Sequence, residues 1–159
     1  GSFDLIVSIL SVHQVNDLPG MLVQLKQILK PGGMLMLCVP GPETLYELRD
    51  AFLQAGMDNG VAPRIHPFLD AREGAGLLQR AGFADPVSDS EMITINYDHP
   101  LKLLQDLRGM GESNSLTAHQ RYLSRKELSE MSHHYQQRYS DADDSIIASV
   151  ELVTLTGWK

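Results

Sequence analysis

Hydrophobic positions along the chain alternate between continuous apolar runs and stretches of helical period. Residues 3–10 are almost continuously apolar, which is typical of a strand buried on both faces of a parallel sheet. Residues 34–39 form a second run of this kind. Between them, apolar side chains recur every three or four positions over residues 18–29, which predicts a helix that Asp17 caps and that the turn at residues 30–33 ends. Strand, helix and strand together predict a βαβ unit.

The rest of the chain carries helix signals and two further strand signals. Capping residues predict helices after Thr44, Asp70 and Ser124, each followed three positions later by a glutamate, and a further helix is expected from His99 onward. Alternation at residues 93–97 and a Val-, Ile- and Thr-rich stretch at residues 146–156 predict the remaining strands. This order predicts a single α/β domain over residues 1–159 with a mixed sheet.

Composition and charge narrow the range of partners. The 159 residues fit one domain, and 13 Lys and Arg against 20 Asp and Glu give a net charge of −7. A phosphate backbone requires a basic face, so we expect no nucleic-acid partner. No apolar run approaches the roughly 20 residues of a membrane span, and the one cysteine, Cys38, excludes an internal disulfide framework. We expect a soluble intracellular protein.

Candidate chemistry gathers where the first two predicted strands end. The sequence holds no Walker loop, no His-Glu-x-x-His and no Gly-x-Ser-x-Gly, and its scattered histidines predict no metal site. In open α/β sheets, ligands bind outside the carboxyl ends of the strands. Ser11 and His13 follow the first strand and can exchange protons, whereas Cys38, inside the second strand, is interpreted as core packing. On the residues alone, the favoured interpretation is that Ser11 and His13 cap a loop and an exposed turn.

Several motifs carry a resemblance to a known family. Residues 3–8, His13, residues 16–19 and the Leu-Lys-Pro-Gly-Gly at 29–33 resemble the second half of a class I S-adenosylmethionine-dependent methyltransferase. In that family, an F-D-x-[IV] strand is followed by a helix ending in L-K-P-G-G and then by another apolar strand. Residues 44–49, 81–83, 106–114 and 157–159 are similar to the methyltransferase-like assembly factors of respiratory complex I. These factors are in turn similar to the malonyl-carrier-protein O-methyltransferase of biotin synthesis.

The resemblance implies a partial Rossmann-like class I methyltransferase fold. The family's sheet order is 3-2-1-4-5-7-6, and this chain is expected to supply strands 4-5-7-6 with flanking helices. The family's glycine-rich cofactor loop, and the acidic residue that holds the cofactor ribose, precede the strand that residues 3–10 match. We therefore expect residues 1–159 to be the C-terminal, substrate-side part of the domain. Alone, they are expected to bind S-adenosylmethionine weakly or not at all and to be inactive.

The resemblance also assigns site residues. Ser8, Leu10 and Ser11 would line the methionine end of the cofactor, and His13 would act near the transferred group as a base or an orienting residue. The expected substrate-side residues are Tyr46, Arg49, Gly111, Glu112 and Asn114.

Two functions follow from the resemblance. The first is methyl transfer from S-adenosylmethionine to a small-molecule or protein acceptor. The alternative is a non-catalytic assembly or protein-binding module, and complex I assembly factors of this kind are also reported to hydroxylate an arginine. The expected location is the bacterial cytoplasm or the mitochondrial matrix.

The first predicted strand also suggests a partner. It carries one charge, Asp4, and in the family it is flanked by the family's first strand on one side and by residues 34–39 on the other. We expect its free edge to be covered, either by an N-terminal portion or by self-association through Phe3–Leu10 as a two-fold antiparallel pair.

Overall fold

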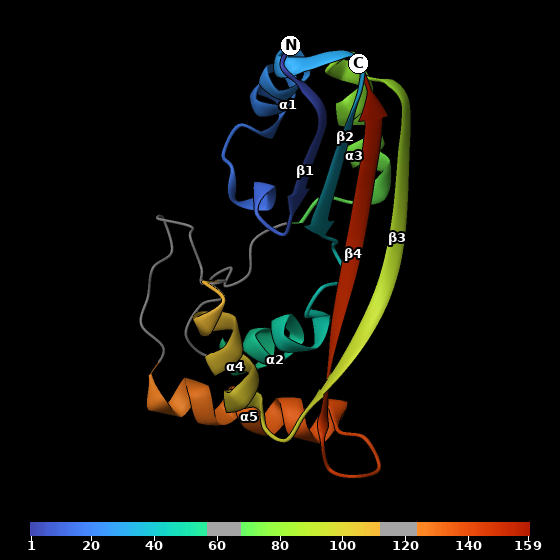
Figure 1. Ribbon diagram of the computed structural model, residues 1–159. Coiled ribbons are helices and arrows are strands. Elements are labelled where there is room, and N and C mark those ends of the chain that lie inside the picture. The colour runs from blue at the N-terminus through green and yellow to red at the C-terminus, as the bar shows by residue number, and fades with distance from the viewer. Residues whose placement is uncertain (57–67, 112–123) are drawn as a thin grey trace. The chain divides into compact units, whose positions relative to one another are not determined.

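The computed structural model describes residues 1–56, 68–111 and 124–159 as a mixed α/β chain (Figure 1). Four strands form one sheet in the order β1-β2-β4-β3. The strands are β1 (Phe3–Ile9), β2 (Leu29–Pro40), β3 (Ala84–Tyr97) and β4 (Ile146–Trp158). The helices are the 3₁₀ turn η1 (Val12–Gln14), α1 (Leu18–Ile28), α2 (Tyr46–Gly56), α3 (Ala71–Arg80), α4 (Pro100–Gly109) and α5 (Arg125–Tyr139).

Strand pairing confirms the predicted fold class. β1 pairs with β2 in parallel, with Ile6 opposite Leu35, and β4 pairs with β2 antiparallel, with Leu37 opposite Leu155. The last strand in sequence therefore inserts beside the second one. This is the order 4-5-7-6 that the resemblance implies.

The chain divides into two compact units, each described by itself below. The sheet unit consists of Gly1–Thr44, Phe68–Met92 and Glu151–Lys159, and the helical unit consists of the described residues of Leu45–Pro67 and Ile93–Val150. β3 and β4 contribute residues to both units. The expectation of a single domain over residues 1–159 stays a prediction.

Helix α1 begins and ends through local signals. The Asp17 carboxylate accepts a hydrogen bond from the Gly20 N–H at 2.9 Å, which confirms the predicted cap. The helix ends at Ile28, but β2 begins at once, so residues 30–33 belong to the strand and the expected turn there is wrong. Leu29 pairs with Phe3, and the register shifts between Phe3 and Leu5, where β2 passes through the left-handed Gly32 (φ +76°).

Two of the three predicted glutamate-spaced caps form. Asp70 accepts from the Glu73 N–H at 2.7 Å, and Ser124 and Glu127 make the reciprocal capping box that starts α5. The box expected between Thr44 and Glu47 is wrong. Glu47 is fully buried, and its carboxylate accepts the hydroxyl and the N–H of Ser149 on β4, because a buried carboxylate must find donors there.

The core of the sheet unit lies on one face of the sheet. Helices α1 and α3 both pack on the face that carries the apolar side chains of alternate β2 and β4 positions. The buried members of this core are Val12, Leu22, Leu29, Leu35, Leu37, Val39, Leu78, Phe83, Val153 and Leu155. Val7 of β1 lies in register with Met36 of β2 on the opposite face, and no element within the described residues covers that face.

The prediction that residues 3–10 form a strand buried on both faces is therefore wrong. Phe3, Leu5, Val7 and Ile9 are between 48% and 67% exposed, and only the alternate position Ile6 packs on the core. Both helices that flank β1 and β2 pack on the same side, and this leaves the odd-numbered side chains of β1 uncovered within the described ranges.

The helical unit packs α2, α4 and α5 around buried Leu48, Leu103 and Met131. Fully buried Tyr135 donates its hydroxyl to the Ile147 carbonyl at 2.9 Å, and desolvation raises its pKa well above the usual range. The neighbouring Tyr139 donates to Asp50 at 2.9 Å, and this carboxylate also meets the Arg138 guanidinium at 3.1 Å.

Two glycines of α3 provide a matched test of the packing on β4. A Cβ on Gly74 would lie 2.5 Å from a methyl group of buried Leu155, whereas a Cβ on Gly76 would meet only the end of Arg80, at 3.4 Å. We expect Gly74→Ala to lower the free energy of unfolding by about 1–2 kcal/mol and Gly76→Ala to raise it by about 0.5–1 kcal/mol. Chemical denaturation measures both, and equal effects of the two substitutions would contradict this packing.

The Tyr139–Asp50 contact predicts an alkaline pH dependence. Desolvation, followed by the hydrogen bond to Asp50, raises the pKa of Tyr139 from 10.0 to about 12. The folded state therefore retains this proton where the unfolded state has lost it, so the contact stabilises fully below pH 10 and is lost as the pH rises toward 12. We expect the free energy of unfolding of Tyr139→Phe to fall less steeply between pH 10 and pH 12 than that of the wild type, as measured by chemical denaturation at each pH. An unchanged slope would contradict the assignment.

Candidate functional site

The carboxyl ends of β1 and β2 lie at one edge of the sheet unit, because the two strands are parallel and adjacent (Figure 1). The Leu10 N–H donates to the Cys38 carbonyl at 2.8 Å, which continues the hydrogen bonding to β2 one residue beyond the end of β1. Leu10 itself is left-handed (φ +49°), so the chain turns sharply there into η1. Buried Val12 then anchors that turn in the core beside Val39.

This turn brings together the four residues expected to face the cofactor and the transferred group. The hydroxyls of Ser8 and Ser11 lie 2.9 Å apart, on either side of Leu10. His13 follows in η1, is half-buried, and packs its ring edge-on against Phe68, with the ring centroids 6.3 Å apart. Two hydroxyls and an imidazole can donate and accept hydrogen bonds and exchange a proton with a ligand.

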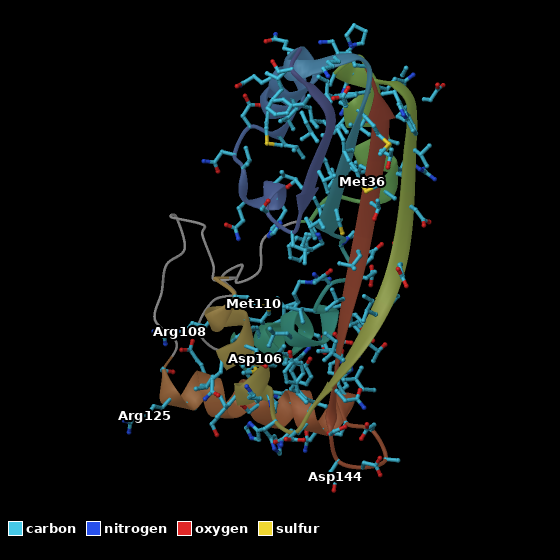
Figure 2. All side chains as sticks on the ribbon, in the orientation of Figure 1. Met36, Asp106, Arg108, Met110, Arg125 and Asp144 are labelled. Carbon is cyan, nitrogen blue, oxygen red and sulfur yellow. The ribbon has the colours of Figure 1, made fainter. Side chains whose placement is uncertain are left out.

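The substrate-side residues lie in the helical unit. Tyr46 is 40% exposed and packs edge-on against Tyr139 with ring centroids 5.9 Å apart. Arg49, half-buried, follows three positions later on the same side of α2. Gly111 (φ +81°) lies in the turn that ends α4, beyond Arg108 and Met110 (Figure 2). Glu112 and Asn114 lie outside the described residues.

Glu151 on β4 is a residue that the sequence reasoning missed. Its carbonyl accepts from the Gly41 N–H at 2.8 Å and from the Thr44 hydroxyl at 3.0 Å, and its own N–H donates to that hydroxyl at 3.0 Å. A Cβ on Gly41 would lie 2.4 Å from the Glu151 carboxyl carbon, so a larger residue there would have to displace the Glu151 side chain. The turn after β2 is thereby fixed to β4.

The Cys38 thiol lies inside β2, as expected, and is half-buried between Ile9 and Thr154 in register. Within residues 1–56, 68–111 and 124–159, no group of three or more His, Cys, Asp or Glu side chains could hold a metal ion. The described helices include none that is long and apolar enough to cross a bilayer.

Comparison with known proteins adds family evidence to this geometry. Residues 1–86, more than half of the chain, match the family model described as a methyltransferase domain. The chain is 38% identical over 160 residues to "Arginine-hydroxylase NDUFAF5, mitochondrial" from Danio rerio. The matched region covers 99% of this chain and 50% of that protein. It is 34% identical to "Malonyl-[acyl-carrier protein] O-methyltransferase" from Halorhodospira halophila, with 99% of this chain and 52% of that protein covered.

The fold is also found among solved structures. A Bacillus halodurans protein described as a methyltransferase superposes with a TM-score of 0.59 at 13% identity, over 99% of this chain and 64% of its own. The chain spans about half the length of the curated relatives that it matches. Because the family model matches more than half of the chain, and the strand order agrees with it, the chain belongs to the methyltransferase domain family.

Proposed function

We propose that the complete protein transfers a methyl group from S-adenosylmethionine to a nucleophilic acceptor, and that residues 1–159 form the far wall of its site. The observation that carries this proposal is the cluster of Ser8, Ser11 and His13 at the carboxyl end of β1 in a chain of this family. When bound, S-adenosylmethionine supplies an electrophilic methyl group.

The residues at this edge fit part of such a cofactor. The paired hydroxyls of Ser8 and Ser11 can hydrogen-bond the carboxylate or ammonium of a methionine moiety, and the exposed Leu10 between them offers an apolar surface. The net charge of −7 suits a ligand that carries a positive sulfonium group. Residues 1–159 contain no Gly-x-Gly-x-x-Gly after a strand, so we assign the rest of the cofactor site to the complete domain.

His13 is assigned to the acceptor. Its imidazole can take a proton from the acceptor nucleophile or orient that group by a hydrogen bond, while the contact with Phe68 restricts the ring. Tyr46, Arg49 and the turn at Gly111 are assigned to the substrate side. The acceptor is a small molecule or a protein, and the location is the bacterial cytoplasm or the mitochondrial matrix.

A second candidate function is an assembly or protein-binding module. The similarity to a protein named as an arginine hydroxylase bears on this choice only in that a related chain is named for a reaction other than methyl transfer. The two candidates differ in whether the complete protein transfers a methyl group from radiolabelled S-adenosylmethionine to an acceptor. Transfer would support the first, and binding of a protein without transfer would support the second.

Of the predictions that follow from the proposed function, the first concerns the cofactor. We expect residues 1–159 alone to bind S-adenosylmethionine weakly or not at all, because they supply only the hydroxyl and imidazole side of its site. Isothermal titration calorimetry of this chain beside the complete protein measures the difference. A micromolar dissociation constant for residues 1–159 alone would contradict the prediction.

The second prediction concerns His13. In the complete protein, we expect His13→Ala to lower methyl-transfer turnover at least about tenfold, since a positioned acid or base is lost. Cys38→Ser is the matched control, because Cys38 lies within β2 and is assigned to packing. If turnover of His13→Ala equals that of the wild type, His13 only packs against Phe68.

We further propose that the free edge of β1 is paired in the isolated chain by a second copy. Within the described residues, β1 pairs only with β2, and its one charge, Asp4, is bound to Lys30 at 2.8 Å. The opposite edge strand, β3, is protected against such pairing by Asp85, Pro86 and further acidic residues. A two-fold axis through Ile6 would place Phe3 opposite Ile9 and Leu5 opposite Val7, so apolar side chains would meet.

The third prediction tests this pairing. A second copy would pair the free edge of β1 and cover its exposed apolar side chains, so we expect residues 1–159 to sediment as a dimer. Leu5→Lys should convert the dimer to a monomer, while Val87→Lys on the β3 edge should leave it intact. A wild-type chain that stays monomeric at high concentration, with rapid amide exchange along β1, would refute self-association.

A further inference from the structure

The Glu151 side chain makes contacts beyond those of its main chain. One carboxylate oxygen accepts from the Ser90 hydroxyl at 2.5 Å, and the other accepts from the Glu43 N–H at 2.9 Å. The carboxylate thereby joins the middle of the Gly41–Thr44 turn to β3, while the main chain of Glu151 holds the two ends of that turn.

This turn occupies a functional place in the sheet unit. It leaves the carboxyl end of β2, next to the parallel strand from which Ser8, Leu10 and Ser11 emerge. Ligands of open α/β sheets bind at this edge. The position of the turn therefore sets the shape of the wall beside the Ser8–His13 cluster.

The Glu151 carboxylate acts as a hydrogen-bond acceptor and not as a partner in an ion pair among the described residues. The contact at Glu43 is with the main-chain N–H, and none of the ion pairs among the described residues involves Glu151. The side chain instead faces two neutral donors, and Gly41 leaves room for it by lacking a Cβ. The Glu151 side chain thus accepts hydrogen bonds from two separate segments, the turn after β2 and strand β3.

We propose that Glu151 is a positioning residue of the candidate methyl-transfer site, holding the Gly41–Thr44 turn in the form that binds the ligand. This proposal rests on the proposed function. Glu151 acts through the turn and is assigned no contact with the reacting atoms.

Residue-resolved amide exchange in the complete protein tests the contact itself. Glu151→Ala should speed exchange of the Glu43 N–H about tenfold, because its acceptor is lost, while the Gly41 N–H, bound to the main-chain carbonyl, should change little. Glu151→Gln should preserve protection, since the Ser90 hydroxyl can turn from donor to acceptor. Glu91→Gln, an exposed carboxylate on β3, is the charge-matched control. Unchanged Glu43 exchange in Glu151→Ala would overturn the proposal.

Kinetics of the same variants test the functional role. We expect Glu151→Ala to raise KM for the acceptor, or the dissociation constant for S-adenosylhomocysteine, about tenfold with a kcat within about threefold of the wild type, and Glu151→Gln to restore both. If Glu151→Ala does not fold, Ser90→Ala removes one of the two contacts and should give a smaller shift of the same kind. A wild-type protein that binds and transfers, with variants that match it, would refute only the role of Glu151. A wild-type protein that neither binds nor transfers would refute the proposed function on which that role depends.

Discussion

The parallel pairing of β1 with β2 is the constraint on which the rest of the sheet unit depends. With Ile6 opposite Leu35, both strands end at one edge, and the Leu10 N–H closes the pairing on the Cys38 carbonyl. Ser8, Ser11 and His13 then follow in a single sharp turn, and Gly41 begins the neighbouring one. The crossover helix α1 makes this parallel arrangement possible, because parallel neighbours cannot be joined by a short hairpin.

The insertion of β4 beside β2 adds a second constraint. Antiparallel pairing brings Glu151 to the carboxyl end of β2, where its backbone and carboxylate hold the turn at residues 41–44. Two residues before Glu151 on the same strand, Ser149 supplies the two donors for buried Glu47. Strand β4 thus satisfies polar groups of the turn after β2 and of the first turn of α2, from Glu151 and Ser149 respectively.

Local signals in the sequence were sufficient for much of this architecture. In each of the caps at Asp17, Asp70 and Ser124, the side chain accepts from the backbone N–H three residues later, and all three caps form where they are predicted. The strand order came from the resemblance, since pairing between distant strands is not visible in periodicity. Among the site residues, the grouping of Ser8, Ser11 and His13 followed from their proximity in sequence.

The errors arose where the outcome depends on distant contacts. Thr44 and Glu47 have capping-box spacing, yet the Glu47 side chain bonds Ser149, and Thr44 bonds Glu151, 107 positions away. The exposure of β1 depends on which face of the sheet the helices cover, and an apolar run carries no information about this. Glu151 likewise has no local motif, because its role comes from Gly41, Glu43 and Ser90 meeting it in the fold.

In the proposed function, the carboxyl edge of β1 and β2 binds the methyl donor. An NMR titration of the complete protein with S-adenosylhomocysteine, followed by the backbone amide signals, tests this binding site. Within residues 1–159, we expect the largest changes at Ser8–His13 and Gly41–Thr44. Changes confined to other segments, such as β3 or α5, with these two turns unaffected, would contradict it.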